Sequence, residues 1–127
     1  MASASSSSDQ LIVVLRDTIV GLVRRDGVDL SSRQLGVFLT CYLRDGGHTV
    51  RGLAAELNVS KPAITRALDR LGELDLARRK LDPLDRRSVL VQRTPKGSAF
   101  LRDVHKIINE SVNPKKSAAK EGRRAAG

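Results

Sequence analysis

The 127-residue chain is poor in aromatic residues: it has one tyrosine, two phenylalanines and no tryptophan. Its hydrophobic core must therefore be formed mainly by Leu, Val, Ile and Ala, a mixture that suits packed helices. The length is sufficient for one domain with one modest core. Apolar residues make up 40% of the chain, which is usual for a globular protein.

Cysteine and long apolar runs are equally scarce. Cys41 is the only cysteine, which excludes an intramolecular disulfide and fits a reducing compartment. No apolar run approaches the roughly 20 residues that a membrane-spanning helix needs, and the first eight residues lack the positive charge and apolar run of a signal peptide. We therefore expect a cytoplasmic protein without a membrane partner, in which Cys41 is a small buried hydrophobic residue.

The motifs of common catalytic and metal sites are also missing. His48 and His105 are far apart and have no Cys or carboxylate at metal-ligand spacing, so zinc is not expected. Glu56 has no partner for general acid-base chemistry, and there is no phosphate-binding Gly-rich loop or nucleophile elbow. We expect no enzymatic activity, no cofactor and no metal.

Positive charge is what the chain has in excess. It contains 23 Lys and Arg against 14 Asp and Glu, a net charge of +9, and 16 of the 23 cations are arginine. A small domain with this excess attracts polyanions. Nucleic acid is the first candidate partner, because guanidinium groups suit both phosphate and guanine. An anionic membrane surface is the second, but the apolar first helix lacks the basic polar face that membrane binding requires.

Composition and capping signals predict one ordered domain over residues 9–113. A Ser/Ala tract at 1–8 and a basic tail at 114–127 are expected to be disordered. Asp9 is placed to cap the first helix, whose Leu, Ile and Val residues cover more than one stripe. Such a helix must be covered on several sides, and a second subunit is one way to cover it.

Further capping signals predict three more helices. Ser31 and Gln34 form a capping box at the start of the second helix, which ends at Asp45-Gly46-Gly47. Thr49 caps a short helix over 50–57, and Ser60 caps the next one after a connection of about three residues. Two short helices joined in this way are the helix-turn-helix signature.

A β-hairpin is predicted directly after the helix-turn-helix. The strand candidates are 76–81 and 88–93, separated by the turn-rich segment 82–87.

Thr94 and Pro95 then open a fifth helix, as its cap and first helical residue, and Asn113-Pro114 ends it. This order predicts a mainly α fold with a small β-hairpin wing, a winged helix-turn-helix. In such a fold the recognition helix fills the DNA major groove and the wing reaches the minor groove.

Three segments between about Leu30 and Leu101 resemble the MarR family of bacterial winged helix-turn-helix regulators. They are LAAELNVSKPAITR at 53–66, the stretch from Leu71 through Leu76 to Arg79, and DPLDRR at 82–87 followed by TPKG at 94–97. The resemblance implies a homodimeric repressor that binds a pseudo-palindromic operator, with the first and last helices forming the dimer interface. It also implies release that is often tuned by a small-molecule effector or by oxidation.

The same resemblance assigns the DNA contacts to the fourth helix and the wing. Ser60, Lys61, Pro62, Thr65 and Arg66 fall where the recognition helix meets bases and phosphates, and Arg70 lies on the same exposed face. At the wing, Arg87 is expected to enter the minor groove while Asp85 orients it, and Arg79 and Arg86 are expected to contact phosphates.

The chain departs from the family pattern in three places. Asp75 replaces the Gly that usually ends the recognition helix, and we expect the turn to be kept because Asp is enriched at positive φ. Pro114 stops the fifth helix early, so the C-terminal helical region is expected to be shorter than in the family. The first helix also lacks the Cys that serves as sensor in the oxidation-sensing branch of the family.

Other interpretations are open at this point. Arg66 and Arg70 fit a solvated helix face, Asp85 with Arg87 fits a local ion pair in a turn, and the basic tail suits either DNA-backbone contact or solubility. The alternative functions are an architectural, nucleoid-type DNA binder with low sequence specificity and a winged-helix module that docks on another protein. Arg66, Arg79 and Arg87 favour DNA over protein docking, because they place positive charge on all three elements that would face DNA.

Overall fold

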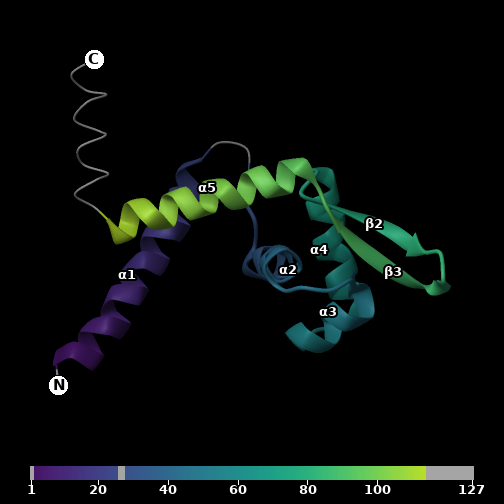
Figure 1. Cartoon of the computed structure of the whole chain (residues 1–127), viewed down its shortest axis with the longest axis horizontal. Helices are drawn as coiled ribbons and strands as arrows, with labels where there is room; N and C mark the ends of the chain where they lie inside the picture. The colour runs from purple at the N-terminus through teal and green to yellow at the C-terminus, as the bar shows by residue number, and fades with distance from the viewer. Residues whose placement is uncertain (1, 26–27, 114–127) are drawn as a thin grey trace, which may run out of the picture. The chain divides into compact units, whose positions relative to one another are not determined.

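The computed structural model describes residues 2–25 and 28–113 (Figure 1). The elements are α1 (Ala2–Arg24), α2 (Ser32–Leu43), β1 (His48–Thr49), α3 (Val50–Leu57), α4 (Lys61–Glu73), β2 (Ala77–Asp82), β3 (Asp85–Arg93) and α5 (Pro95–Val112). The predicted fold class is confirmed: the chain is mainly helical with a small antiparallel sheet. The described residues divide into two compact units, a winged-helix unit over 30–101 and a terminal unit formed by 2–25, 28–29 and 102–113.

The core of the winged-helix unit combines side chains from α2, α3, α4 and the start of the wing. Its largest fully buried residues are Val37, Phe38, Leu53, Ile64, Leu71 and Leu76. Phe38 stacks on Tyr42 with ring centroids 4.3 Å apart and meets Phe100 edge-on at 5.2 Å. All three aromatic residues of the chain therefore lie in one cluster, which compensates for their small number because each ring buries a large apolar area.

Side-chain caps start the helices where the sequence predicts. At α2 the Gln34 N–H donates to Ser31 Oγ at 3.1 Å and the Ser31 N–H donates to Gln34 Oε1 at 2.9 Å, which completes the capping box. Thr49 Oγ1 accepts the Gly52 N–H at the start of α3, and Ser60 Oγ accepts the Ala63 N–H at the start of α4. These caps fix the first turns of both helices of the helix-turn-helix.

One residue with positive φ ends α3, and another follows the end of α4. Asn58 ends α3 at φ 55°, and Asp75 follows α4 at φ 57°. After α4 the Leu76 N–H donates to the Leu71 carbonyl at 2.8 Å and the Asp75 N–H donates to the Gly72 carbonyl at 3.0 Å. This is a Schellman motif, which satisfies carbonyls at the helix end. The expectation that Asp75 keeps the turn in place of Gly is confirmed.

The sheet has the strand order β1-β3-β2, and β2 and β3 form the wing, a hairpin that projects beyond α4 (Figure 1). The sequence analysis missed β1, whose His48 and Thr49 lie opposite Val91 and Leu90 of β3. A strand of two residues has no periodicity to detect. Its pairing holds the start of α3 beside the wing.

The turn of the wing is shorter than expected. β3 begins at Asp85 instead of Ser88, and Asp82 lies opposite Asp85 across the ladder, which leaves a two-residue turn, Pro83-Leu84. The Leu84 N–H donates to Asp82 Oδ1 at 2.9 Å, and Pro83 has a fixed φ, so two residues suffice for the reversal. Leu81 pairs with Val89 while Asp82 pairs with Asp85, so residues 86–88 have no partner on β2 and form a bulge in β3. Arg86 and Arg87 consequently belong to a strand and not to a loop.

In the terminal unit, α1 starts earlier than expected. The helix runs from Ala2 through the Ser/Ala tract that the sequence analysis takes as disordered, and Asp9 lies inside it instead of capping it. Ala is the best helix former, and Ser costs only a few tenths of a kcal/mol to roughly half a kcal/mol per residue. The tract can therefore extend the apolar helix that follows it. The basic tail and the shortened C-terminal end fall on 114–127, outside the described residues, and stay predictions.

Three contacts, each about one helical turn from the next, join α1 to the second part of α5. Ser111 Oγ donates to Asp17 Oδ2 at 2.8 Å, and Arg25 Nη1 lies 2.7 Å from Asp103 Oδ2. Between these two contacts Gly21 packs closely on Ile107, so that a Cβ added to Gly21 would lie 2.7 Å from Ile107 Cγ2. Residue numbers rise along α1 while they fall along α5, so the two helices are antiparallel.

Much of the apolar surface of α1 is exposed. Leu11 and Val13 lie beside Ser111 and Val112 of α5, whereas Ile12, Leu15, Ile19 and Val23 form an exposed stripe on the side turned away from the contacts with α5. In the part of the chain that the structure describes, no helix combines the length and the hydropathy needed to cross a membrane.

Candidate nucleic-acid interface

The start of α3, the first half of α4 and the wing enclose a cleft of about 490 Å³. Five of the ten predicted DNA-contacting residues line it, and they come from three different elements. These residues are Lys61 and Thr65 of α4, Arg79 of β2, and Asp85 and Arg87 of β3. The structure therefore brings together the two parts of the sequence, recognition helix and wing, that the predicted fold pairs on DNA.

A shallow open hollow adjoins the cleft on α4. It is lined by Lys61, Pro62, Thr65 and Arg66, and it shares Lys61 and Thr65 with the cleft. Seven of the ten predicted residues thus belong to one continuous surface. Lys61, Pro62 and Arg66 are exposed on it, as a group that contacts a large ligand must be.

The other three predicted residues lie outside this surface. Ser60 Oγ accepts the Ala63 N–H at 3.2 Å, so its side chain caps α4. Arg70 Nη1 lies 3.1 Å from Glu73 Oε2, farther along the helix. Arg86 is exposed in the part of β3, residues 86–88, that has no partner on β2, and it does not line the cleft although its neighbours Asp85 and Arg87 do.

The cleft is strongly cationic. Arg51, Lys61, Arg79 and Arg87 line it, against a single carboxylate, Asp85. Arg79 is paired with Asp69 of α4, which links the wing to that helix. Within residues 2–25 and 28–113, no carboxylate lies at ion-pair distance from Arg51, Lys61 or Arg87. These three charges are therefore available to an anionic ligand.

Asp85 acts on the backbone of the wing. Its Oδ1 accepts the backbone N–H of Arg87 at 3.0 Å and forms no ion pair with the guanidinium group of Arg87. The carboxylate thereby fixes the local chain conformation two residues on, in the manner of an Asx turn. The Arg87 side chain is left exposed.

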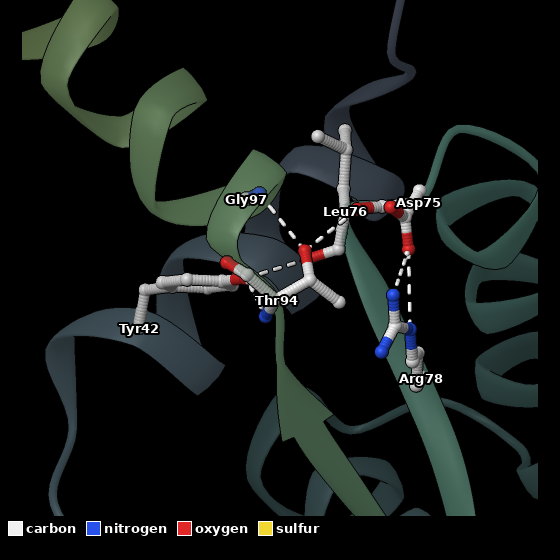
Figure 2. A network of polar contacts seen from close by, with 6 residues as sticks. All are labelled: Tyr42, Asp75, Leu76, Arg78, Thr94 and Gly97. Carbon is white, nitrogen blue, oxygen red and sulfur yellow. Dashed lines mark hydrogen bonds and ion pairs between the residues drawn. The ribbon is translucent and has the colours of Figure 1, made fainter.

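A buried polar network holds both ends of the hairpin to the helices (Figure 2). The Tyr42 hydroxyl of α2 donates to the Leu76 carbonyl at 2.7 Å and accepts the Thr94 N–H at 2.9 Å. Thr94 Oγ1 in turn donates to the Asp75 carbonyl at 2.6 Å and accepts the Gly97 N–H at 2.9 Å. Leu76 precedes β2 and Thr94 follows β3, so the network sets where the wing leaves the helical core.

Arg51 is a cleft residue that the sequence analysis missed. It is exposed in the first turn of α3, whereas the MarR-like segment that assigned contacts lies farther along the chain. The pairing of β1 with β3, which joins residues more than 40 positions apart in the chain, brings the start of α3 next to the wing. One sequence signal pointed toward Arg51. The Thr49 cap places Arg51 in the first turn of α3, at the end of the helix that lines the cleft.

Cys41 is buried, and this burial raises the pKa of its thiol to about 11, which keeps it protonated at neutral pH. No group of three or more His, Cys, Asp or Glu side chains that would suit a metal ion occurs among the residues described. The expectation that Cys41 is a buried structural residue is confirmed.

Comparisons with known proteins agree with this fold. The model of the MarR family matches residues 28–88, while comparison with curated protein sequences gives no match. The structure is similar to transcriptional regulator Tm0710 from Thermotoga maritima, with a TM-score of 0.76 and 20% identity over 97% of this chain and 86% of that one.

Two further solved structures are similar over nearly the full length. For MarR the TM-score is 0.59 with 26% identity, covering 94% of this chain and 93% of that one. For S. aureus MepR in complex with DNA the TM-score is 0.66 with 16% identity, covering 99% and 98%.

Proposed function

Through residues 28–88 the chain belongs to the MarR family, and on this premise we propose that it regulates transcription by binding double-stranded DNA through α4 and the wing. The observation that carries the proposal is the cationic cleft, where Lys61, Arg79 and Arg87 converge from three elements. That the similar MepR is a DNA complex supports the same use of the fold. The role requires no catalysis and no cofactor.

Each element has a separate task in this proposal. Lys61, Thr65 and Arg66, in the first turns of α4, read base edges in the major groove, where the start of a recognition helix meets the bases. Arg87 enters the minor groove, whose negative potential attracts Arg. Arg79 and Arg86 contact phosphates, which position the protein without reading sequence. Ser60 and Arg70 support α4 from outside the cleft.

The proposed active form is a homodimeric repressor. The exposed apolar side of α1 supports dimerisation, because Ile12, Leu15, Ile19 and Val23 follow the spacing of one helix face and are at least 47% exposed, and an exposed apolar surface of this kind marks an interaction site. A dimer with two-fold symmetry reads a pseudo-palindrome whose half-sites lie about one helical turn apart. Its place of action is then the nucleoid in the cytoplasm, with a small-molecule effector as a further partner of unknown chemistry.

Selection from genomic DNA tests this function. The purified protein is incubated with fragmented genomic DNA at physiological salt, and the bound fragments are recovered and sequenced. We expect an enriched inverted repeat. Broad recovery without a motif would replace sequence-specific regulation by the architectural alternative. A failure to recover any DNA would contradict the proposal and favour docking on a protein.

A further inference from the structure

Arg51 reaches the DNA-facing cleft by a route that differs from the recognition helix and the wing. It lies in the first turn of α3, two residues after Thr49, which pairs with Leu90 of β3. That pairing fixes the start of α3 to the strand that also carries Arg87. Thr49 of β1 and the first two residues of α3, Val50 and Arg51, together form one wall of the cleft.

The charges around the cleft identify its ligand as an anion. Its four cations face one carboxylate, and the Asp85 carboxylate already accepts the Arg87 N–H. Arg51 is exposed, and among the described residues it has no carboxylate at ion-pair distance. A cleft between a helix that enters the major groove and a hairpin that enters the adjacent minor groove lies over the sugar-phosphate backbone that separates the two grooves.

We propose that this cleft binds a phosphodiester of the DNA backbone, and that Arg51 of α3 is one of its cationic ligands. The inference rests on the proposed DNA-binding function and adds to it a third contacting element. A phosphate contact carries no base information. Arg51 therefore contributes affinity to every DNA sequence alike and helps to set the register of α4 and the wing on the duplex.

The salt dependence of binding to unselected DNA tests the inference. The affinity of the full chain for a fluorescein-labelled 30-base-pair duplex of mixed sequence is measured by anisotropy at several KCl concentrations. The variants are Arg51→Ala, Arg51→Lys and, as matched control, Arg33→Ala. Arg33 is exposed on α2 in the same unit and does not line the cleft, so both alanine variants remove one surface charge.

One phosphate contact contributes about 0.9 to the slope of log K against log salt concentration. We expect Arg51→Ala to reduce the steepness of the slope by about this amount on two unrelated duplexes, Arg51→Lys to retain it, and Arg33→Ala to leave it unchanged. Equal slopes for Arg51→Ala and Arg33→Ala, with intact wild-type binding, would overturn the inference and leave the proposed function in place. No binding by the wild type would refute the proposed function itself. Arg51→Gln gives the same readout if the alanine variant does not fold.

Discussion

Gly97 lies where the start of α5 meets the polar network at the base of the wing (Figure 2). A Cβ added there would overlap the Tyr42 hydroxyl oxygen and would lie 2.5 Å from the Leu76 carbonyl oxygen. The second of these is a backbone atom that cannot swing away. The Thr94-Pro95-Lys96-Gly97 motif is therefore explained by its geometry: Thr94 caps the helix and Gly97 leaves room for the hydroxyl that ties both hairpin ends to α2.

Substitution of Gly97 by Ala is expected to destabilise the protein by about 3 kcal/mol or more, because a buried overlap of this size forces the wing and α5 apart. Gly36→Ala is the matched control. A Cβ at Gly36 meets only Leu57 Cδ2 at an ordinary 3.7 Å, and Ala is the better helix former, so a gain of about 0.5–1 kcal/mol is expected. Urea unfolding followed by circular dichroism measures both. Equal stability of the two variants would contradict the packing described.

Individual side chains were predictable where their partners are close in sequence. The capping residues Ser31, Thr49 and Ser60 all act within three residues, so the sequence locates them. Tyr42 contacts groups 34 and 52 residues away, and no local pattern reveals such a partner. Arg51 escaped prediction for the same reason, since its place in the cleft depends on a long-range strand pairing.

Helices and strands differ in how far the sequence defines them. The start of α4 and the turn at Asp75 follow from caps and turn chemistry, which act locally. β1 and the start of β3 at Asp85 depend on cross-strand pairing, so the predicted hairpin was too short and the predicted sheet had one strand too few. The early start of α1 was missed because a Ser/Ala tract has the composition of a disordered segment as well as an acceptable helix propensity.

The pairing of α1 with α5 is expected to weaken in acid. The Ser111 hydroxyl, which donates to Asp17, and then Arg16 lower the pKa of the Asp17 carboxyl below its ordinary value. A carboxyl with a lowered folded-state pKa stabilises the fold above its unfolded pKa of about 3.9, and this contribution is lost as the pH falls through the folded-state value. We therefore expect Asp17→Asn to flatten the dependence of unfolding free energy on pH between about 5 and 2.

Ser111→Ala is the companion variant, since it removes the donor and keeps the carboxylate. It is expected to flatten the same pH dependence in part, because Arg16 continues to lower the pKa of Asp17. Urea unfolding at a series of pH values measures both effects. Profiles that run parallel to the wild type would refute a role of this contact in stability.

The chain in solution is expected to be a dimer that the exposed side of α1 holds together. Leu15 is 59% exposed on that side, and a charge there would be buried without a partner in a dimer, which is costly. Light scattering is expected to give twice the chain mass of 13.8 kDa for the wild type and the single-chain mass for Leu15→Glu.

Leu84→Glu provides the control for this experiment. Leu84 is 95% exposed at the turn of the wing, so the same substitution at an apolar surface residue is expected to leave the dimer intact. A wild type with the mass of a single chain, or loss of the dimer in both variants, would argue against α1 as the interface.

The most direct test of DNA binding through α4 and the wing is the affinity of Arg87→Ala for a duplex recovered from genomic DNA. Arg87 is exposed, lines the cleft and has no carboxylate at ion-pair distance among the described residues, so its removal leaves the fold intact. Anisotropy titration at physiological salt is predicted to show a loss of about tenfold or more, with an unchanged melting temperature. Binding as tight as that of the wild type would contradict the assignment of the wing to DNA.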